Sequence, residues 1–163
     1  MRICTKHYTG MHGLYVKAIP GYATVALLTD LLAGSDPPCR PERLFHATII
    51  SSDITPSSIY ITYPGRDIHT CLVRAEYWAG GNGSGFVVLR LRAKTFNLFH
   101  RMYSSLGAKH KYPGGYIPHV TAGMSVGVKT EAITQWLFRL NSRIHLFDTP
   151  VVFNRMRVRD VRF

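Results

Sequence analysis

The chain has 163 residues, a length that predicts one domain able to bury its own core. Hydrophobic residues make up 46% and charged residues 18%, which are globular proportions and exclude wholesale disorder. Twenty Lys and Arg against nine Asp and Glu give a formal net charge of +11. We therefore expect a polyanionic partner: a nucleic acid, a nucleotide or another phosphate ester.

The first half of the chain alternates strand-like and helix-like segments. Its predicted elements are a strand at 13–19, a helix at 22–34, a strand at 43–50 and short strands at 59–63 and 68–78. The helix is expected to end at Gly34, because glycine is favoured at the C-terminal end of a helix.

The second half repeats the order strand, helix, strand after a glycine-rich turn at 80–85. Its predicted elements are a strand at 86–93, a helix at 95–106, a strand at 116–124, a helix around 133–140 and strands at 143–149 and 151–159. The connecting loop at 107–115 is basic, and we expect it to be solvated.

These two halves suggest a duplicated architecture without a low-complexity linker between them. We interpret residues 1–163 as a single α+β domain with two lobes, approximately 1–80 and 81–163.

Three features bear on the compartment. The longest apolar runs, such as 86–89, are too short to span a bilayer, and the N-terminal segment lacks the apolar core of a signal peptide. Cys4, Cys39 and Cys71 form no CxxC pair, which predicts reduced thiols rather than disulfides or a zinc cluster. We expect a cytoplasmic protein with no membrane partner.

Two strand segments carry the same polar pair. His46 and Thr48 lie within LFHATII, and His119 and Thr121 lie within YIPHVTAGM. Side chains at i and i+2 of a strand share one face, so each segment should present an imidazole and a hydroxyl together. Two such strands side by side would line one cleft.

Chance weakens the spacing as a signal. About one His-x-Ser/Thr triplet is expected in a chain of this composition, and three occur. The third, at His7, has no apolar strand around it, and we expect it to be a decoy. Either strand motif alone is also typical of a partly buried histidine bonded to a backbone carbonyl. The strand context and the duplication favour a site.

With both motifs in a basic, bilobal chain, the sequence resembles the 2H phosphoesterase superfamily. The resemblance implies two antiparallel sheets that line a central cleft, with helices outside. It implies metal-independent cleavage or formation of phosphodiesters without a cofactor. His46, Thr48, His119 and Thr121 match the four catalytic positions of the superfamily.

The flanking residues distinguish branches of the superfamily. Bacterial RNA 2′,3′-cyclic phosphodiesterases typically continue the first motif into an aromatic-Leu-Gly turn and follow the second with Arg. Here ISSD and GMS follow instead. The early strand at 13–19 and both motifs are more similar to phage anti-CBASS phosphodiesterases. That branch degrades the cyclic di- and trinucleotides that bacteria use as antiphage signals, which would place the protein in the host cytoplasm.

The residue types permit general acid–base cleavage at a 3′–5′ linkage. A neutral histidine would take the proton of a ribose 2′-OH, and a protonated one would donate to the departing 5′-oxygen. The threonine hydroxyls would stabilise the non-bridging oxygens. No carboxylate cluster accompanies the histidines, so no metal is expected.

Three aromatic residues are candidates for substrate binding: Tyr15, Trp78 and Tyr116. Stacking of a base on an aromatic ring contributes about 1–3 kcal/mol. The resemblance favours Tyr15 and Trp78 in this role. Arg155, Arg157 and Arg159 share one face of the last strand and are expected to face solvent, adding to the positive field.

The expected partner is a cyclic di- or trinucleotide, with no stable nucleic-acid duplex. Two other functions remain open at this point. One is an RNA 2′,3′-cyclic phosphodiesterase or RNA-end processing enzyme of the same superfamily. The other is a non-catalytic nucleotide sponge or RNA-binding module, which would need the cleft but not both histidine–hydroxyl pairs.

Overall fold

The structure, a computed structural model, describes residues 3–34, 38–42, 44–53, 58–64, 67–81, 83–111 and 115–160. The helices are α1 (Tyr22–Ala33), α2 (Lys94–Ser105) and α3 (Thr130–His145). The strands are β1 (Ile3–Thr9), β2 (Leu14–Pro20), β3 (Arg40–Pro41), β4 (Ala47–Ser52), β5 (Ser58–Pro64), β6 (Ile68–Thr70), β7 (Leu72–Ala79), β8 (Ser84–Leu91), β9 (His119–Val126) and β10 (Val151–Asp160).

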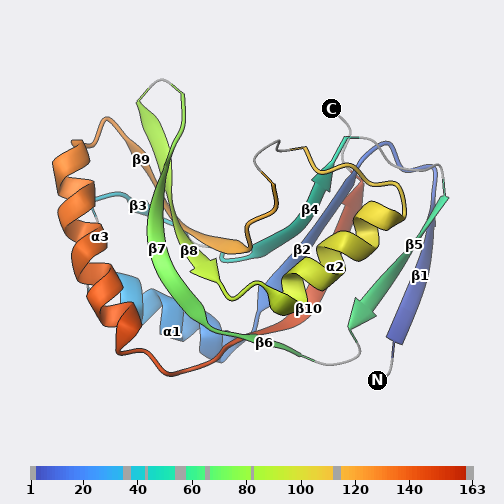
Figure 1. Cartoon of the computed structure of the whole chain (residues 1–163), viewed down its shortest axis with the longest axis horizontal. Helices are drawn as coiled ribbons and strands as arrows, with labels where there is room; N and C mark the ends of the chain where they lie inside the picture. Colours follow the sequence, from blue (N-terminus) through green and yellow to red (C-terminus); the bar gives the residue numbers. More distant parts are fainter. Residues whose placement is uncertain are drawn as a thin grey trace.

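The described strands form two antiparallel sheets, which confirms the predicted α+β fold class. The larger sheet has eight strands in the order β6-β10-β2-β4-β9-β8-β7, with β3 paired to β9. The smaller sheet consists of β1 and β5. Figure 1 shows β4 and β9 diverging upward from the middle of the larger sheet, so that the sheet opens into a V.

A β-α-β unit occurs twice along the chain, as the sequence suggested. The first copy is β2-α1-β4 and the second is β8-α2-β9. Helix α2 begins 72 residues after α1 (94 minus 22), and both helices have 12 residues. Corresponding elements of the two copies are therefore separated by a nearly constant number of residues.

Each arm of the V combines strands from both halves of the chain. Strand β10 comes from the second half but pairs with β2, and β7 comes from the first half but pairs with β8. The predicted division near residue 80 falls between β7 and β8, where the second β-α-β unit begins.

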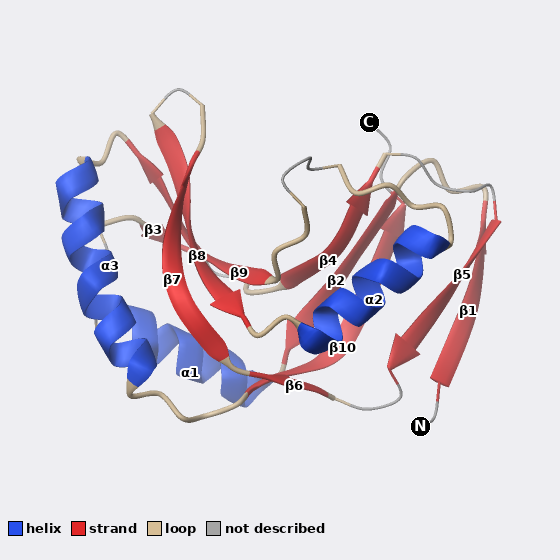
Figure 2. Ribbon diagram, in the orientation of Figure 1, coloured by secondary structure: helices blue, strands red, loops and turns tan. Residues whose placement is uncertain are grey.

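Helix α2 covers one face of the β2–β4–β10 arm. Leu14, Val16 and Ala18 alternate along β2 with no exposed surface, as the two-residue period of a strand requires. Phe96 of α2 meets Phe153 of β10 edge to face, with ring centroids 5.3 Å apart. Figure 2 shows α2 lying across β2 and β10. The helix thus leaves the opposite face of this arm open.

Helix α3 packs against β7 in the other arm. Its buried residues are Ile133, Trp136, Leu140 and Ile144, at the three- and four-residue spacing of one helix face. Asn141 ties the helix to the strand: its Oδ1 accepts from the Ala75 N–H at 2.7 Å, and its Nδ2 donates to the Ala75 carbonyl at 3.1 Å.

Several predicted boundaries are wrong. The strand predicted at 143–149 does not form, because α3 continues to His145 and buries Ile144 on its apolar face. The strand predicted from 43 begins at Ala47, and the segment 68–78 is divided into β6 and β7. Sequence reasoning missed β1 and β3. The predicted loop at 107–115 lies partly outside the described residues.

Gly123 allows β3 to approach β9, and a side chain there should destabilise the fold. A Cβ at this position would meet Cys39 Sγ at 2.7 Å and the Arg40 carbonyl oxygen at 2.8 Å. We expect Gly123→Ala to lower the free energy of unfolding by about 1–3 kcal/mol in urea denaturation. Gly81→Ala, where a Cβ meets open space, is the control. Equal stability of the two variants would contradict this packing.

Candidate active site

One backbone pair brings the two His-x-Thr segments together. Strands β4 and β9 pair antiparallel at Ala47 and Val120. His46 and Thr48 flank the first of these residues, and His119 and Thr121 flank the second. Because antiparallel strands run in opposite directions, His46 lies beside Thr121 and Thr48 lies beside His119. Side chains opposed in this way have Cβ atoms about 5 Å apart.

The two segments share an irregularity directly after the threonine. Where β2 pairs with β4, Lys17 lies opposite Thr48 and the preceding residue, Val16, lies opposite Ile50. Ile49 is therefore an extra residue in β4. Opposite β9, the register likewise shifts between Val87 and Val88 and leaves Ala122 unpaired. Each is a β-bulge, which changes the face that later residues occupy.

In β4 the bulge carries Ser51 onto the polar face. Strict alternation from Thr48 would have placed Ile50 there, but Ile50 is fully buried and Ser51 lines the cavity.

Both histidines are oriented by a backbone carbonyl two residues earlier. His46 Nδ1 lies 3.1 Å from the Leu44 carbonyl oxygen, and His119 Nδ1 lies 2.7 Å from that of Ile117. A carbonyl oxygen only accepts, so Nδ1 carries the proton in both rings. In the neutral imidazole, Nε2 is then the basic nitrogen of each ring.

Tyr15 joins the first histidine to the first threonine. Its hydroxyl lies 3.0 Å from His46 Nε2 and 3.1 Å from Thr48 Oγ1. A neutral His46 with its proton on Nδ1 accepts from the tyrosine at Nε2, and the tyrosine oxygen can accept from Thr48. Tyr15, predicted as a stacking residue, therefore also positions His46.

Trp78 packs against the second histidine. The Trp78 and His119 ring centroids lie 4.4 Å apart at an interplanar angle of 61°. Trp78 Nε1 donates to Glu76 at 3.0 Å, and Arg90 donates to the same carboxylate at 3.0 Å. Desolvation raises the pKa of Glu76, but hydrogen bonds from Trp78, Arg90 and Arg74 outweigh it and lower the pKa overall. The carboxylate therefore holds the indole in place.

Tyr116 braces β4 from the loop that enters the V. Its hydroxyl donates to the Thr48 carbonyl at 3.0 Å, and burial raises its pKa. One face of its ring stacks on His100, with centroids 4.1 Å apart. His100 Nδ1 donates to the Ile49 carbonyl at 2.8 Å, at the bulge. The hydrogen bond and the stacked face indicate a positioning role for Tyr116 beside the predicted one.

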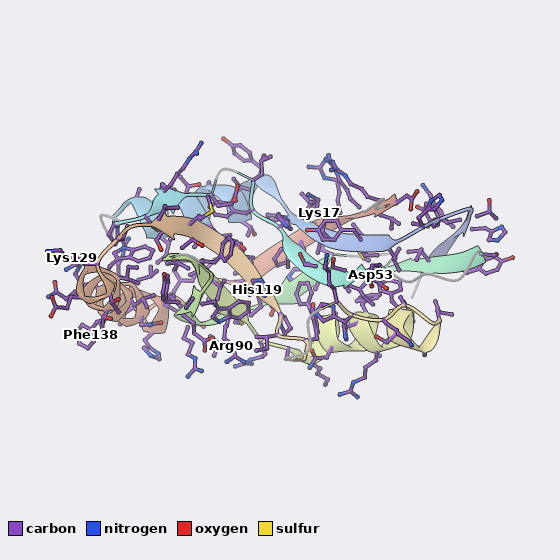
Figure 3. The ribbon with its side chains drawn as sticks, turned by 90° about the horizontal axis from the view of Figure 1, so that it is seen from above. Lys17, Asp53, Arg90, His119, Lys129 and Phe138 are labelled. Carbon is purple, nitrogen blue, oxygen red and sulfur yellow. The ribbon has the colours of Figure 1, made fainter. Side chains whose placement is uncertain are left out.

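These residues surround a cavity of about 480 Å³, within the usual range of ligand pockets. It is lined by Tyr15, Thr48, Ser51, Trp78, Phe86, Val88, His110, Gly115, Tyr116, Ile117, His119 and Thr121. His46 adjoins the cavity through the Tyr15 hydroxyl. Figure 3 shows His119 near the middle of the molecule, between Lys17 and Arg90 in that view.

All seven predicted site residues therefore lie in or beside one cavity. Sequence reasoning missed Ser51 and His100. It placed His110 on the basic loop that was expected to be solvated, whereas His110 lines the cavity. His100 could have been noticed because it lies on the buried face of α2, one residue after Phe99 and three before Tyr103.

The decoy histidine lies elsewhere. His7 belongs to β1, contrary to the expectation that no strand surrounds it. Its Nε2 lies 2.6 Å from Ser58 Oγ, and its ring stacks on Tyr60 of β5. It does not line the cavity.

The two site histidines resist protonation and influence one another. Desolvation lowers the pKa of His46 and of His119 below the usual 6.5, and the hydrogen bonds from Nδ1 only partly offset this. A charge on His46 lowers the pKa of His119 further. Near neutrality, at most one of the two imidazole rings is therefore expected to carry a positive charge.

The described residues contain neither a cluster of metal-binding side chains nor a membrane-spanning helix. Among those residues, no three His, Cys, Asp or Glu side chains gather in a way that could hold a metal ion. No helix there combines the length and apolar character needed to cross a membrane.

The depressed histidine pKa values should make stability depend on pH. An unfolded histidine has a pKa near 6.5, so below that pH the unfolded chain binds protons that the folded chain refuses. The contribution of these histidines to the free energy of unfolding should be complete above about pH 6.5, and it should decrease as the pH is lowered from there.

Urea denaturation between about pH 7.5 and pH 5 checks this. A His46→Gln/His119→Gln variant should show a shallower loss, and the exposed His145→Gln should keep the wild-type slope. An unchanged slope in the double variant would contradict the burial of the pair.

Comparison with known proteins identifies the family. A family model described as "Anti-CBASS protein Acb1" matches residues 12–149. A search of curated proteins finds no match. Among matching solved structures is that of Usb1 from Kluyveromyces marxianus with uridine monophosphate. It is 8% identical with a TM-score of 0.50, and the match covers 93% of this chain and 95% of that one.

The structural likeness shows the fold, which is the 2H phosphoesterase-like fold predicted from the sequence. The family match spans most of the chain, so this chain belongs to the anti-CBASS protein Acb1 family.

Proposed function

We propose that this protein cleaves 3′–5′ phosphodiester bonds in cyclic di- or trinucleotides and thereby removes immune signals in the cytoplasm of an infected cell. Family membership and fold support an anti-CBASS phosphoesterase. The observation that carries the finer proposal is the array on β4 and β9, with two histidines and two threonines around one backbone pair. Thr48, His119 and Thr121 line the cavity, and His46 adjoins it through the Tyr15 hydroxyl.

The chemistry begins at the ribose 2′-OH next to the scissile phosphate. A neutral histidine takes the hydroxyl proton at Nε2, and the 2′-oxygen attacks the 3′-phosphorus. The bond from phosphorus to the 5′-oxygen breaks, and the protonated second histidine gives its proton to that oxygen. The product ends in a 2′,3′-cyclic phosphate, which the same pair can open with water to a 3′-phosphate.

The electrostatics of the cavity suit this division of labour. Each imidazole is buried enough to favour the neutral form, and a charge on one disfavours a charge on the other. An anionic phosphate entering between them would favour protonation of one ring. The bound state would then contain one base and one acid, as the reaction requires.

The threonines and aromatic residues hold the phosphate and the base. Thr48 and Thr121 each lie beside a histidine of the opposite strand, where a hydroxyl can donate to a non-bridging oxygen. Trp78 lines the cavity next to His119 and offers its ring to a nucleobase. Tyr15 can contribute its ring to the cavity wall while its hydroxyl orients His46.

Removing either histidine should abolish cleavage of a cyclic dinucleotide. His46→Ala and His119→Ala should each lower turnover by about 10²–10⁴-fold, because each removes one proton-transfer group. Turnover is measured by chromatography of the products in the presence of EDTA.

His7→Ala is the matched control, since it alters a His-x-Thr triplet outside the cavity, and it should cut at the wild-type rate. Near-normal turnover by a folded His46→Ala or His119→Ala variant would refute the acid–base assignment. Binding without any turnover by the wild type would instead indicate a nucleotide sponge.

The substrate's own hydroxyl should be the nucleophile. A 2′-deoxy cyclic dinucleotide keeps the bases and phosphates but lacks the attacking group, so it should bind and remain intact. Ribose substrate should yield only 2′,3′-cyclic phosphate and 3′-phosphate ends, as identified by mass spectrometry.

Two results would contradict this mechanism. Cleavage of the deoxy compound, or 5′-phosphate ends, would mean that water attacks the diester directly. Selective opening of a linear RNA 2′,3′-cyclic phosphate, with the cyclic dinucleotide left intact, would favour the RNA-end enzyme instead.

A further inference from the structure

Three cationic residues, Lys17, Arg157 and Arg159, lie on the open face of the β2 arm beside the cavity. In the β2–β10 register, Arg157 lies opposite Lys17 and Arg159 lies opposite Tyr15. Directly opposed residues of antiparallel strands share a face, so both arginines project on the side where Tyr15 lines the cavity. Met156, the residue before Arg157, packs against the core and does not share this face.

Within the part of the chain that the structure describes, no salt bridge joins Lys17, Arg157 or Arg159 to a carboxylate, and the salt bridges there involve Asp160 and Glu76. The Asp160 carboxylate accepts hydrogen bonds from the backbone N–H groups of His12 and Gly13. The Asp160 carboxylate therefore interacts with the chain turn before β2.

The neighbouring arginines affect the pKa of Lys17. Desolvation lowers its pKa, the charges of Arg159 and Arg157 lower it further, and only Glu42 opposes them. The Lys17 ammonium also lies 5.9 Å from the Tyr15 ring centroid. Like charges held together in this way repel one another, and a bound anion would relieve the repulsion.

The duplicated architecture supplies an internal comparison. Glu76 and Trp78 of β7 hold the positions that Arg157 and Arg159 hold on β10, because β7 flanks β8 as β10 flanks β2. In the β7 arm the Glu76 carboxylate neutralises Arg90 and fixes the indole. One arm therefore offers an aromatic surface with its charges paired, and the other offers cations.

We infer that Lys17, Arg157 and Arg159 form a second phosphate site, which binds the phosphate of the cyclic substrate that is not being cut. The inference rests on the proposed function, because the scissile phosphate is assigned to the histidine pair. Strand β2, which carries Lys17, lies one strand spacing from β4, and β10 lies two spacings away, about 10 Å, so the cations lie close to the histidine pair. With a base on Trp78, the remote phosphate turns toward the cationic arm.

The test compares a probe with two phosphates and a probe with one. The 2′-deoxy cyclic dinucleotide has both, and the linear 2′-deoxy dinucleoside monophosphate has only the bond that the histidines would hold. Arg157→Gln/Arg159→Gln should weaken calorimetric binding of the cyclic probe by about tenfold or more. Binding of the linear probe should be nearly unchanged.

Arg101→Gln/Arg139→Gln is the matched control. It removes the same two charges from exposed positions on α2 and α3, and it should leave the binding of both probes unchanged. Both double variants should keep the wild-type melting temperature.

Three results would overturn the second phosphate site: equal losses in the two double variants, equal losses for the two probes, or no binding of the cyclic probe by the wild type. Failure of the proposed function has a different signature. If the cyclic probe binds with the predicted arginine dependence but the ribose cyclic dinucleotide is not cut, the site stands and the catalytic proposal falls.

Discussion

The pairing of Ala47 with Val120 is the contact on which the arrangement of this molecule depends. It is the one register position at which β4 and β9 meet, and it joins the two arms of the larger sheet. Residues on either side of it supply the two histidines and the two threonines. Because β4 and β9 diverge beyond this point, the loop carrying Tyr116 can enter between them and complete a cavity. The contact that closes the sheet therefore also assembles the site.

Duplication explains both the symmetry of the site and its inequality. Each β-α-β unit contributes a histidine fixed by an i−2 carbonyl and a bulge after the threonine. The neighbouring strands then differ. Tyr15 gives His46 a hydroxyl partner, whereas Phe86, its counterpart on β8, lines the cavity without one. The outer strands differ more, with Trp78 and the Glu76 carboxylate on one side and, on the other, arginines that form no salt bridge with any described residue. The two histidines therefore have different surroundings, which the proposed division into one acid and one base requires.

The sequence was sufficient for local features and insufficient for those that depend on register. The i, i+2 spacing correctly placed His46 and Thr48 on one face, since the period of a strand is a local property. It could not place the Tyr15 hydroxyl between them, because that contact depends on how β2 aligns with β4 around a bulge. The strand predicted at 143–149 failed because Ile144 completes a helical face that begins eleven residues earlier, at Ile133.

A structure of the wild-type protein with a bound 2′-deoxy cyclic dinucleotide tests the central claim most directly. The account predicts one phosphate between Nε2 of His46 and Nε2 of His119, each within hydrogen-bonding distance of about 3 Å, with Thr48 and Thr121 on its non-bridging oxygens. A nucleotide whose phosphates all lie away from both imidazoles would contradict it, and the histidine pairs would then be part of the scaffold rather than the chemistry.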